Sequence, residues 1–134
     1  MHVDYAFICD YAEARDKVNA LGIGFDTIYA QKLPARHPHF SVVLQLRFSL
    51  TEVGSKSVKV HLIDADGKDV IPPVNGNIQV NPPQLGVLES TARLVMEFGN
   101  VEFKEYAHYS VKVNLEGQEV VSIPIRVAQP PRTS

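Results

Sequence analysis

Apolar residues recur at every second position over most of this chain. The clearest run lies between residues 40 and 48, where five apolar side chains alternate with polar ones. Such alternation is typical of a strand that buries one face and exposes the other. The pattern predicts seven strands, at residues 3–9, 21–29, 40–48, 58–62, 92–98, 109–115 and 121–127, and at most one further short strand at 78–80.

Turn residues separate these segments. The stretches DADGKD and LEGQE carry Asp66-Gly67 and Glu116-Gly117, which favour hairpin turns because glycine supplies the positive φ angle. Two longer connections, QKLPARHPH and PPVNGNIQVNPPQLGVLES, are broken by proline, which keeps them from extending a sheet. The stretch AEARDKVN has no apolar stripe, so it predicts at most one or two helical turns.

The stretch EYAHYSV favours a particular kind of all-β fold. Glu105, Ala107 and Tyr109 have the spacing of a tyrosine corner, and Val111 lies where an antibody domain carries a cysteine. The chain has no tryptophan and no cysteine pair, which excludes a true antibody-type domain. We therefore predict an all-β, antiparallel β-sandwich of seven to eight strands, immunoglobulin-like or C2-like. Residues 1–128 are expected to form one domain and residues 129–134 a flexible tail.

The composition limits the number of domains, the classes of partner and the cellular compartment that we expect. A length of 134 residues with 45% hydrophobic residues suits one self-supporting domain. The net charge of −2 gives no general attraction for nucleic acid or anionic membranes. One cysteine cannot form an internal disulfide, the first residues lack the basic region of a signal peptide, and no long apolar run is present. These features predict a cytoplasmic protein with no membrane or nucleic-acid partner.

Cys9 raises the question of a reactive thiol, since Asp10 and Glu13 follow it. Its alternation partners Val3, Tyr5 and Phe7 place it on the core side of a strand, where free cysteine behaves as a small hydrophobe. We expect it to be inert. Gly22 and Gly24 lack the third glycine and the following helix of a phosphate loop, so they indicate a bulge or a close backbone approach.

Two short motifs are candidate metal sites. Asp64, Asp66 and Asp69 of DADGKD offer the hard oxygen ligands that calcium prefers, although a charged hairpin turn explains the same residues. His37 and His39 are separated by Pro38 in a predicted loop, and zinc usually needs at least three protein ligands. We expect no cofactor and no catalytic residue, because no nucleophile–base arrangement is visible.

Basic residues occupy several outward strand positions, while most acids lie in turns. Such a distribution suits an anionic partner face or head-to-rim packing of copies, and it equally suits ordinary solvated strands. These basic residues are Arg47, Lys59, Arg93, Lys112 and Arg126.

The stretches DYAFICDYAE, KVNALGIGFDTI, HLIDADGK and YAHYSVKVNLEGQEVVSIPIRV span nearly the whole chain. Together they resemble a family of small bacterial proteins defined only as a domain of unknown function. The resemblance implies a β-sandwich and a bacterial cytosolic setting, and it implies no reaction, ligand or site residues.

The function that these features favour is binding. We expect a non-enzymatic binding or scaffold domain that recognises a protein partner, or self-associates, through a sheet face or edge. The alternative is a sandwich that binds a metal or small ligand through the loop residues of DADGKD or RHPH.

Overall fold

The computed structural model describes residues 1–131, and residues 132–134 of the predicted tail lie outside the described part. The described residues form β-strands and one 3-10 turn, with no α-helix among them. The strands are β1 (His2–Cys9), β2 (Tyr11–Ala14), β3 (Val18–Leu21), β4 (Thr27–Tyr29), β5 (Ala35–Ser49), β6 (Gly54–Ile63), β7 (Val74–Val80), β8 (Glu89–Phe103), β9 (Ala107–Leu115) and β10 (Gln118–Ala128), and the 3-10 turn η1 is Leu50–Glu52.

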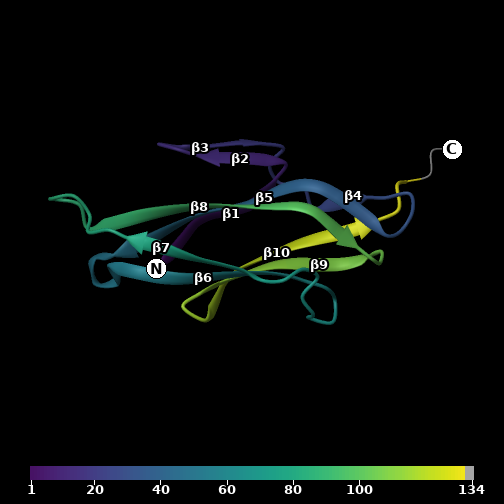
Figure 1. The fold of residues 1–134 in the computed structure, drawn as a ribbon. Coiled ribbons are helices and arrows are strands. Elements are labelled where there is room, and N and C mark those ends of the chain that lie inside the picture. The colour runs from purple at the N-terminus through teal and green to yellow at the C-terminus, as the bar shows by residue number, and fades with distance from the viewer. Residues whose placement is uncertain (132–134) are drawn as a thin grey trace.

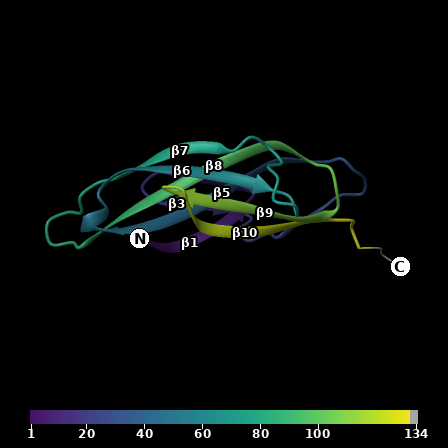
Figure 2. The ribbon, with the colours of Figure 1, turned by 90° about the horizontal axis from the view of Figure 1, so that it is seen from below.

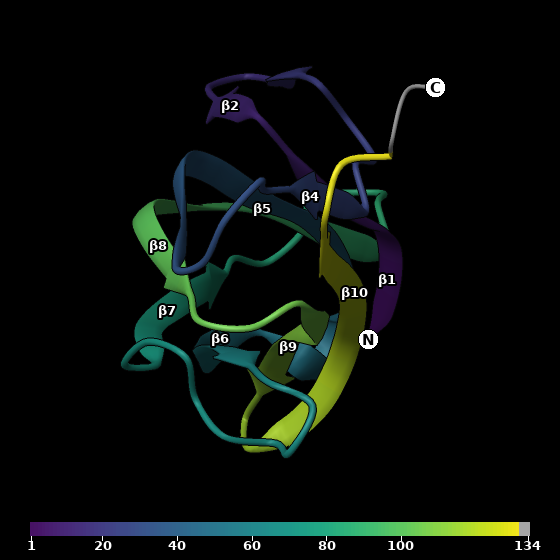
Figure 3. The same ribbon diagram turned by 90° about the vertical axis from the view of Figure 1, so that its right-hand side faces the viewer.

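The strands form three sheets (Figure 1). One has the order β1-β5-β8, a second has the order β4-β10-β9-β6-β7, and β2 pairs with β3 as a small separate hairpin. Every strand pair is antiparallel except β4 with β10, which is parallel. Seen end-on in Figure 3, the five-stranded sheet curves beneath the three-stranded sheet, and the hairpin lies above.

Between the two larger sheets lies the main hydrophobic core, as the alternating pattern predicted. The apolar positions of β5, β6, β9 and β10 are largely buried, and so is Phe98 of β8. Phe40 and Phe98 stack across the β5–β8 pair with ring centroids 4.9 Å apart. Because the inner faces of both sheets are apolar, the hydrophobic effect holds them together.

A bulge in β1 corrects the prediction for Cys9. The pairing of β1 with β5 shifts register between Val3 and Tyr5, so Asp4 is the extra residue and the sides exchange there. Val3 and Ile8 therefore pack in the main core, whereas Cys9 belongs to a second cluster with Ala12 and Val43. The prediction that Cys9 is buried is confirmed, and the prediction that it shares a face with Val3 is wrong.

The β2–β3 hairpin covers this second cluster and occupies the stretch AEARDKVN, where at most one or two helical turns were predicted. The single strand predicted at 21–29 is wrong, because β3 ends at Leu21 and only Thr27–Tyr29 form a strand, β4. Gly22 and Gly24 have φ angles of +67° and +83°, which turn the chain away from an extended path. Leu21, which pairs with the exposed Tyr11 in the hairpin, is 69% exposed. A Cβ at Gly22 would overlap the Asp10 carboxyl group, so the predicted close approach is confirmed there.

Two connections also differ from the prediction. The proline-broken segment after Ile71 contains the seven-residue strand β7, which is longer than the short strand predicted at 78–80. β6 and β7 are joined by residues 64–73, with Gly67 at a φ of +83°, so DADGKD is part of a longer connection than a two-residue hairpin. The turn at Glu116-Gly117, with φ angles of +51° and +79°, is a two-residue hairpin as predicted.

The tyrosine-corner spacing corresponds to a real contact. The Tyr109 hydroxyl at the start of β9 donates a hydrogen bond to the Glu105 carbonyl oxygen at 2.9 Å. The ring is buried and packs edge-on against Phe103 at 4.9 Å. This bond ties the β8–β9 connection to the strand that follows it.

Replacing Tyr109 by phenylalanine is expected to lower the free energy of unfolding by about 1 kcal/mol, because the Glu105 carbonyl loses its partner while the ring still packs. Urea unfolding of the wild type and the variant measures the difference. Tyr29→Phe is the matched control, since Tyr29 is exposed. Equal stability of all three proteins would show that the corner bond contributes nothing.

Candidate functional site

The five basic residues predicted as a partner face divide between the two larger sheets. Arg47 and Arg93 lie on the three-stranded sheet, and the other three lie on the five-stranded sheet. Arg47 Nη2 contacts Asp4 Oδ2 at 2.8 Å, and Arg93 Nε donates to Gln45 Oε1 at 2.8 Å. Hydrogen bonds from Arg47 and then Gln45 lower the pKa of Asp4. These side chains bind one another across the strands, and the five do not form one basic patch.

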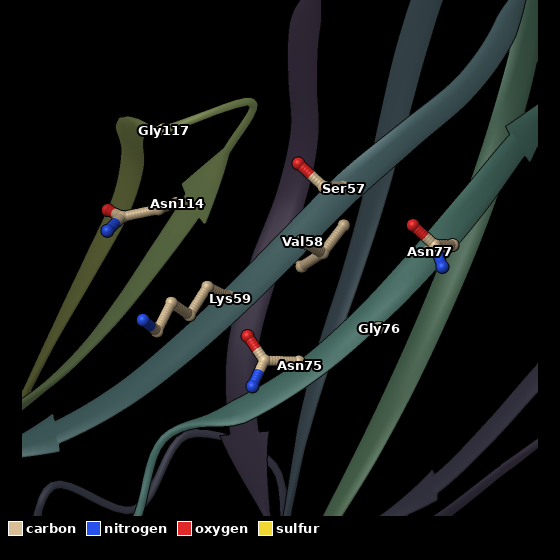
Figure 4. A pocket seen from close by; sticks show the side chains of 8 residues that line it. All are labelled: Ser57, Val58, Lys59, Asn75, Gly76, Asn77, Asn114 and Gly117. Carbon is tan, nitrogen blue, oxygen red and sulfur yellow. The ribbon is translucent and has the colours of Figure 1, made fainter.

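A shallow pocket on the outer face of the five-stranded sheet contains Lys59 (Figure 4). Across the strands, Lys59 pairs with Asn75 of β7 and with Asn114 of β9. The volume is about 440 Å³, and the lining residues are Ser57, Val58, Lys59, Asn75, Gly76, Asn77, Asn114 and Gly117. The amides, hydroxyl and ammonium can hydrogen-bond a polar ligand, but this lining holds no carboxylate or imidazole for acid–base chemistry.

The other two basic residues of this sheet stand apart from that pocket. Lys112 Nζ donates to Ser122 Oγ at 2.8 Å and lies 3.5 Å from Glu119 Oε1. Arg126 lies on β10, where it pairs with Thr27 of the short parallel strand β4. Lys112 therefore already has an acidic neighbour on the adjacent strand.

Two of the three aspartates of DADGKD, Asp64 and Asp69, already contact groups of the protein nearby in sequence. Asp64 Oδ1 accepts hydrogen bonds from the backbone N–H groups of Asp66 and Lys68, both at 2.9 Å. Asp69 Oδ1 lies 2.8 Å from His61 Nδ1. All three line a pocket of about 290 Å³ together with Glu102 and Glu105. Within residues 1–131, however, no group of three or more His, Cys, Asp or Glu side chains is placed to hold a metal ion.

The two histidines of RHPH lie in β5 and not in a loop, which corrects the prediction. β5 begins at Ala35, so Pro38 is a strand residue. The His37 ring packs against Phe25 and Phe40, and burial lowers the pKa of this histidine. His39 Nδ1 instead lies 2.8 Å from the Asp10 carbonyl oxygen. The two rings have different neighbours and do not converge on one ion.

Cys9 is buried as a free thiol beneath the hairpin. Burial, and then the charge of Asp10, raise the pKa of this thiol, while its Sγ lies 3.4 Å from the Tyr11 carbonyl oxygen. Since the thiolate is the reactive form, these surroundings disfavour nucleophilic chemistry. Across the β1–β5 pair, Cys9 is opposite Ser41, whose buried hydroxyl has no hydrogen-bond partner among residues 1–131.

Sequence reasoning missed a group of exposed apolar side chains at one end of the molecule. We call this group the apolar tip, and it consists of Leu50, Val53, Leu85, Val87 and Leu88. Leu50 and Val53 lie in the connection from β5 to β6, and the other three in the connection from β7 to β8. Ser49 pairs with Glu89, and Gly54 pairs with Val80, so the two connections leave the sheets at the same end.

Figures 1 and 2 show both connections at that end in two perpendicular views. Leu85 is wholly exposed and Leu88 is 74% exposed. The available signal was the stretch QLGVL, in which three apolar residues stand in a proline-broken loop outside any alternating strand. Several exposed large apolar side chains gathered together mark a binding surface more often than single ones do.

A family model matches residues 4–128, which is nearly the whole chain, and its description is a family of unknown function, DUF6941. The chain belongs to DUF6941. The comparison with curated proteins found no match, and the comparison with solved structures found none either. The resemblance to a domain-of-unknown-function family is thereby confirmed.

Within the described residues of the DUF6941 chain, no helix has the length and apolar character needed to cross a membrane.

A carboxylate supports the turn that presents Leu50. Glu52 Oε1 accepts hydrogen bonds from the Met1 ammonium group at 2.8 Å, and from the Ser49 backbone N–H and hydroxyl at 3.0 and 3.1 Å. These bonds, the first of them most strongly, lower the pKa of Glu52 from 4.5 to about 2. The charged form of Glu52 therefore stabilises η1 of the DUF6941 chain.

This contribution is expected to depend on pH. Because the pKa is lower in the folded state, the stabilisation is fully present above pH 4.5 and is lost as the pH falls toward about 2. Glu52→Gln should reduce the free energy of unfolding near neutral pH by less than about 1 kcal/mol, since the side chain is partly exposed. Urea unfolding from about pH 6 to about pH 2 should show the difference shrinking, and a constant difference would contradict the assignment.

Proposed function

We propose that this DUF6941 chain is a non-enzymatic binding or scaffold domain, and that its contact surface is the apolar tip. The single observation that carries the proposal is the exposure of five large apolar side chains on two neighbouring connections. Exposing apolar surface to water is unfavourable, so such a group favours a protein that is covered by a partner. This surface lies at the loops, which differs from the sheet face or edge expected from the sequence.

The fold that we propose is an immunoglobulin-like sandwich. Its support is the strand order: β1-β5-β8 follows the order A-B-E, and β10-β9-β6-β7 follows G-F-C-C′. The Tyr109 hydrogen bond lies near the start of β9, which corresponds to strand F. A C2-like arrangement, the other expectation, has no comparable local support in this chain.

That correspondence also favours binding at the tip. In variable-type immunoglobulin domains, the B–C and F–G loops of one end contact the ligand. Here Leu50–Glu52 and Val53 join the strands equivalent to B and C, and the β9–β10 hairpin reaches the same end of β6, where Glu116 Oε1 accepts from the Ser57 N–H at 2.9 Å.

The non-enzymatic part of the proposal is supported by the candidate groups themselves. Cys9 is buried with a raised pKa, and the lining of the Lys59 pocket has no acid–base pair. The cytoplasmic setting is likewise a proposal, supported by the single, free and buried cysteine.

Site-specific photo-crosslinking in the cell tests whether the tip is a contact surface. A photoreactive residue replaces Gln84, which is exposed beside Leu85, and the matched control places the same residue at the exposed Gln79 of β7. We expect discrete adducts from position 84, and their loss when Leu85→Asp and Leu88→Asp are added. No adduct from position 84, or the same adducts from both positions, would overturn the proposal.

A further inference from the structure

One edge of the three-stranded sheet has no strand beside it. β8 pairs with β5 along one side, and within residues 1–131 no strand pairs with its outer side. Figure 3 shows β8 at the opposite side of this sheet from β1. Unpaired backbone N–H and C=O groups along a strand edge form a template for pairing with another chain.

This edge is long and regular, whereas the other outer strands are shorter or interrupted. β1 has the bulge at Asp4, β4 has three residues and β7 has seven. β8 has fifteen residues and pairs with β5 without a break from Glu89 to Gly99. Its regular backbone ends at Asn100, where φ is +50°. We call residues 91–99 of β8 the open edge, and they contain neither the bulge nor the proline that protects other strand edges.

The proposed immunoglobulin-like order accounts for the open edge. In such a sandwich, strand D pairs with the outer side of strand E and gives the order A-B-E-D. β8 corresponds to strand E, but the connection of residues 81–88 that precedes it forms no strand. The open edge therefore has the backbone geometry to accept one further antiparallel strand.

Two exposed charges on the open edge have no ionic partner. Arg93 donates hydrogen bonds to the uncharged Gln45 side chain at 2.8 Å and to the Asp16 carbonyl oxygen at 3.5 Å. Neither Arg93 nor Glu97 forms an ion pair with any of residues 1–131. Because the two lie about 13 Å apart along one strand, they do not meet within one chain.

We propose that two copies of this chain associate by pairing their open edges as antiparallel strands centred on Val95. In this register Arg93 of each copy lies opposite Glu97 of the other, so both charges gain an opposite partner. The same residues meet across a two-fold axis, so the contact is isologous and closes as a dimer. It joins the two three-stranded sheets into one, at a surface separate from the apolar tip, and so goes beyond the proposed function.

Charge selects this register over its neighbours. Centring the pair on Arg93 or on Glu97 brings two like charges together at the two-fold axis, which is destabilising. Of the registers centred on one of residues 92–98, only the one centred on Val95 places opposite charges face to face.

On the core side of the edge, the same register matches apolar side chains. Leu94 lies opposite Met96 of the second copy, and within one chain both are only partly buried against the main core. Pairing removes more of their surface from water, which is favourable. The β2–β3 hairpin leaves the edge accessible, since a hollow of about 530 Å³ lies between β2 and the side chains of Arg93, Val95 and Glu97.

Charge reversal tests the contact. Arg93→Glu places glutamates opposite each other and Glu97→Arg places arginines opposite each other, so each variant alone should stay a monomer. An equimolar mixture restores both opposite pairs and should form complexes of two chains. Lys59→Glu is the matched control, because it makes the same charge change as Arg93→Glu at an exposed residue of the other sheet. All three sites are exposed, so the variants should fold, and circular dichroism checks this.

Light scattering coupled to gel filtration measures the mass from about 10 μM to about 1 mM, because one strand edge is a small and therefore weak contact. We expect the wild type and Lys59→Glu to approach twice the 14.9 kDa of one chain as the concentration rises. A monomeric wild type, single variants that associate like the wild type, or a mixture that stays monomeric would each overturn the inference.

A cysteine at the two-fold axis tests the register. Opposite Cα atoms of an antiparallel pair lie about 4.5 to 5.5 Å apart, a distance that a disulfide can span. Val95→Cys should therefore give a disulfide-linked dimer on mild oxidation. The control Thr91→Cys should not, because in this register its two copies lie about 27 Å apart. No linked dimer from Val95→Cys, or as much from Thr91→Cys, contradicts the register and with it the inference.

The variant Leu85→Asp separates this inference from the proposed function. It should associate like the wild type, because it leaves the open edge unchanged. If Leu85→Asp were monomeric while the wild type associates, the tip would make the contact and the pairing of β8 would be wrong. If the wild type itself is monomeric, only the pairing of β8 is overturned, because the crosslink from position 84 reports on the tip independently.

Discussion

Replacing Phe40 by alanine is expected to lower the free energy of unfolding by about 3–5 kcal/mol, the largest effect of any substitution considered. Phe40 is wholly buried in β5, stacks on Phe98 at 4.9 Å and meets Phe25 edge-on at 6.5 Å. Removing the ring leaves a cavity between the two sheets that the strands on either side cannot fill.

Urea unfolding followed by circular dichroism measures this loss. Leu21→Ala is the control, because Leu21 is largely exposed and its truncation should change stability by no more than about 0.5 kcal/mol. If Phe40→Ala unfolded no more easily than Leu21→Ala, the position of the main core between the two sheets would be wrong.

Replacing Ala12 by aspartate is expected to raise the rate at which a thiol reagent modifies Cys9 by on the order of 100-fold. Ala12 is buried on the underside of β2, in the cluster that also contains Cys9 and Val43. An unpaired carboxylate there costs about 3 kcal/mol, which shifts the opening of the hairpin about 100-fold toward the open form. The main core lies on the other side of the sheet and should retain most of its stability.

The labelling rate is measured in the native protein with an aromatic disulfide reagent, and circular dichroism confirms that the strands remain. Ala14→Asp is the matched control, since Ala14 lies on the same strand and is exposed. Rapid labelling of the wild type, or equal rates in both variants, would show that the hairpin does not protect Cys9.

Local signals predicted those parts of the fold that depend on neighbours in sequence. The alternation from Phe40 to Phe48 identified the face of β5 that packs in the main core, and the spacing of Glu105 and Tyr109 identified a hydrogen bond that the structure contains. The expectation that the other face of β5 is exposed is wrong at Ser41 and Val43, which are buried. Each of these signals works over a few residues, because strand pleat and turn geometry are local properties of the backbone.

The same reasoning failed where one residue changes the register. The bulge at Asp4 exchanges the two sides of β1, and nothing in the alternation of Tyr5, Phe7 and Cys9 distinguishes the main core from the second cluster. Gly22 and Gly24 were recognised as special positions, but the hairpin that they end could not be deduced, because its packing depends on a sheet formed by distant strands.

The candidate site was predictable only in its parts. The sequence identified candidate residues among the basic side chains, DADGKD and RHPH, but it did not identify the side chains that they contact. In the structure, Arg47 contacts Asp4, Asp69 contacts His61, and His37 packs against Phe25. The apolar tip joins two connections that are separated in sequence by residues 54–80, Leu50–Glu52 with Val53 and residues 81–88. Their proximity follows from strand pairing.

The sequence by itself determined that this chain is built of strands, which side chains of the long strands face inward, and where the tight β9–β10 turn lies. Those properties follow from the two-residue period of the backbone and from the φ angles that glycine permits. The tertiary structure alone decided which face Cys9 occupies, which charges are paired, and that Leu50 and Leu85 lie at the same end of the sheets. These features involve segments distant in sequence, and they arise only when the sheets pair and pack.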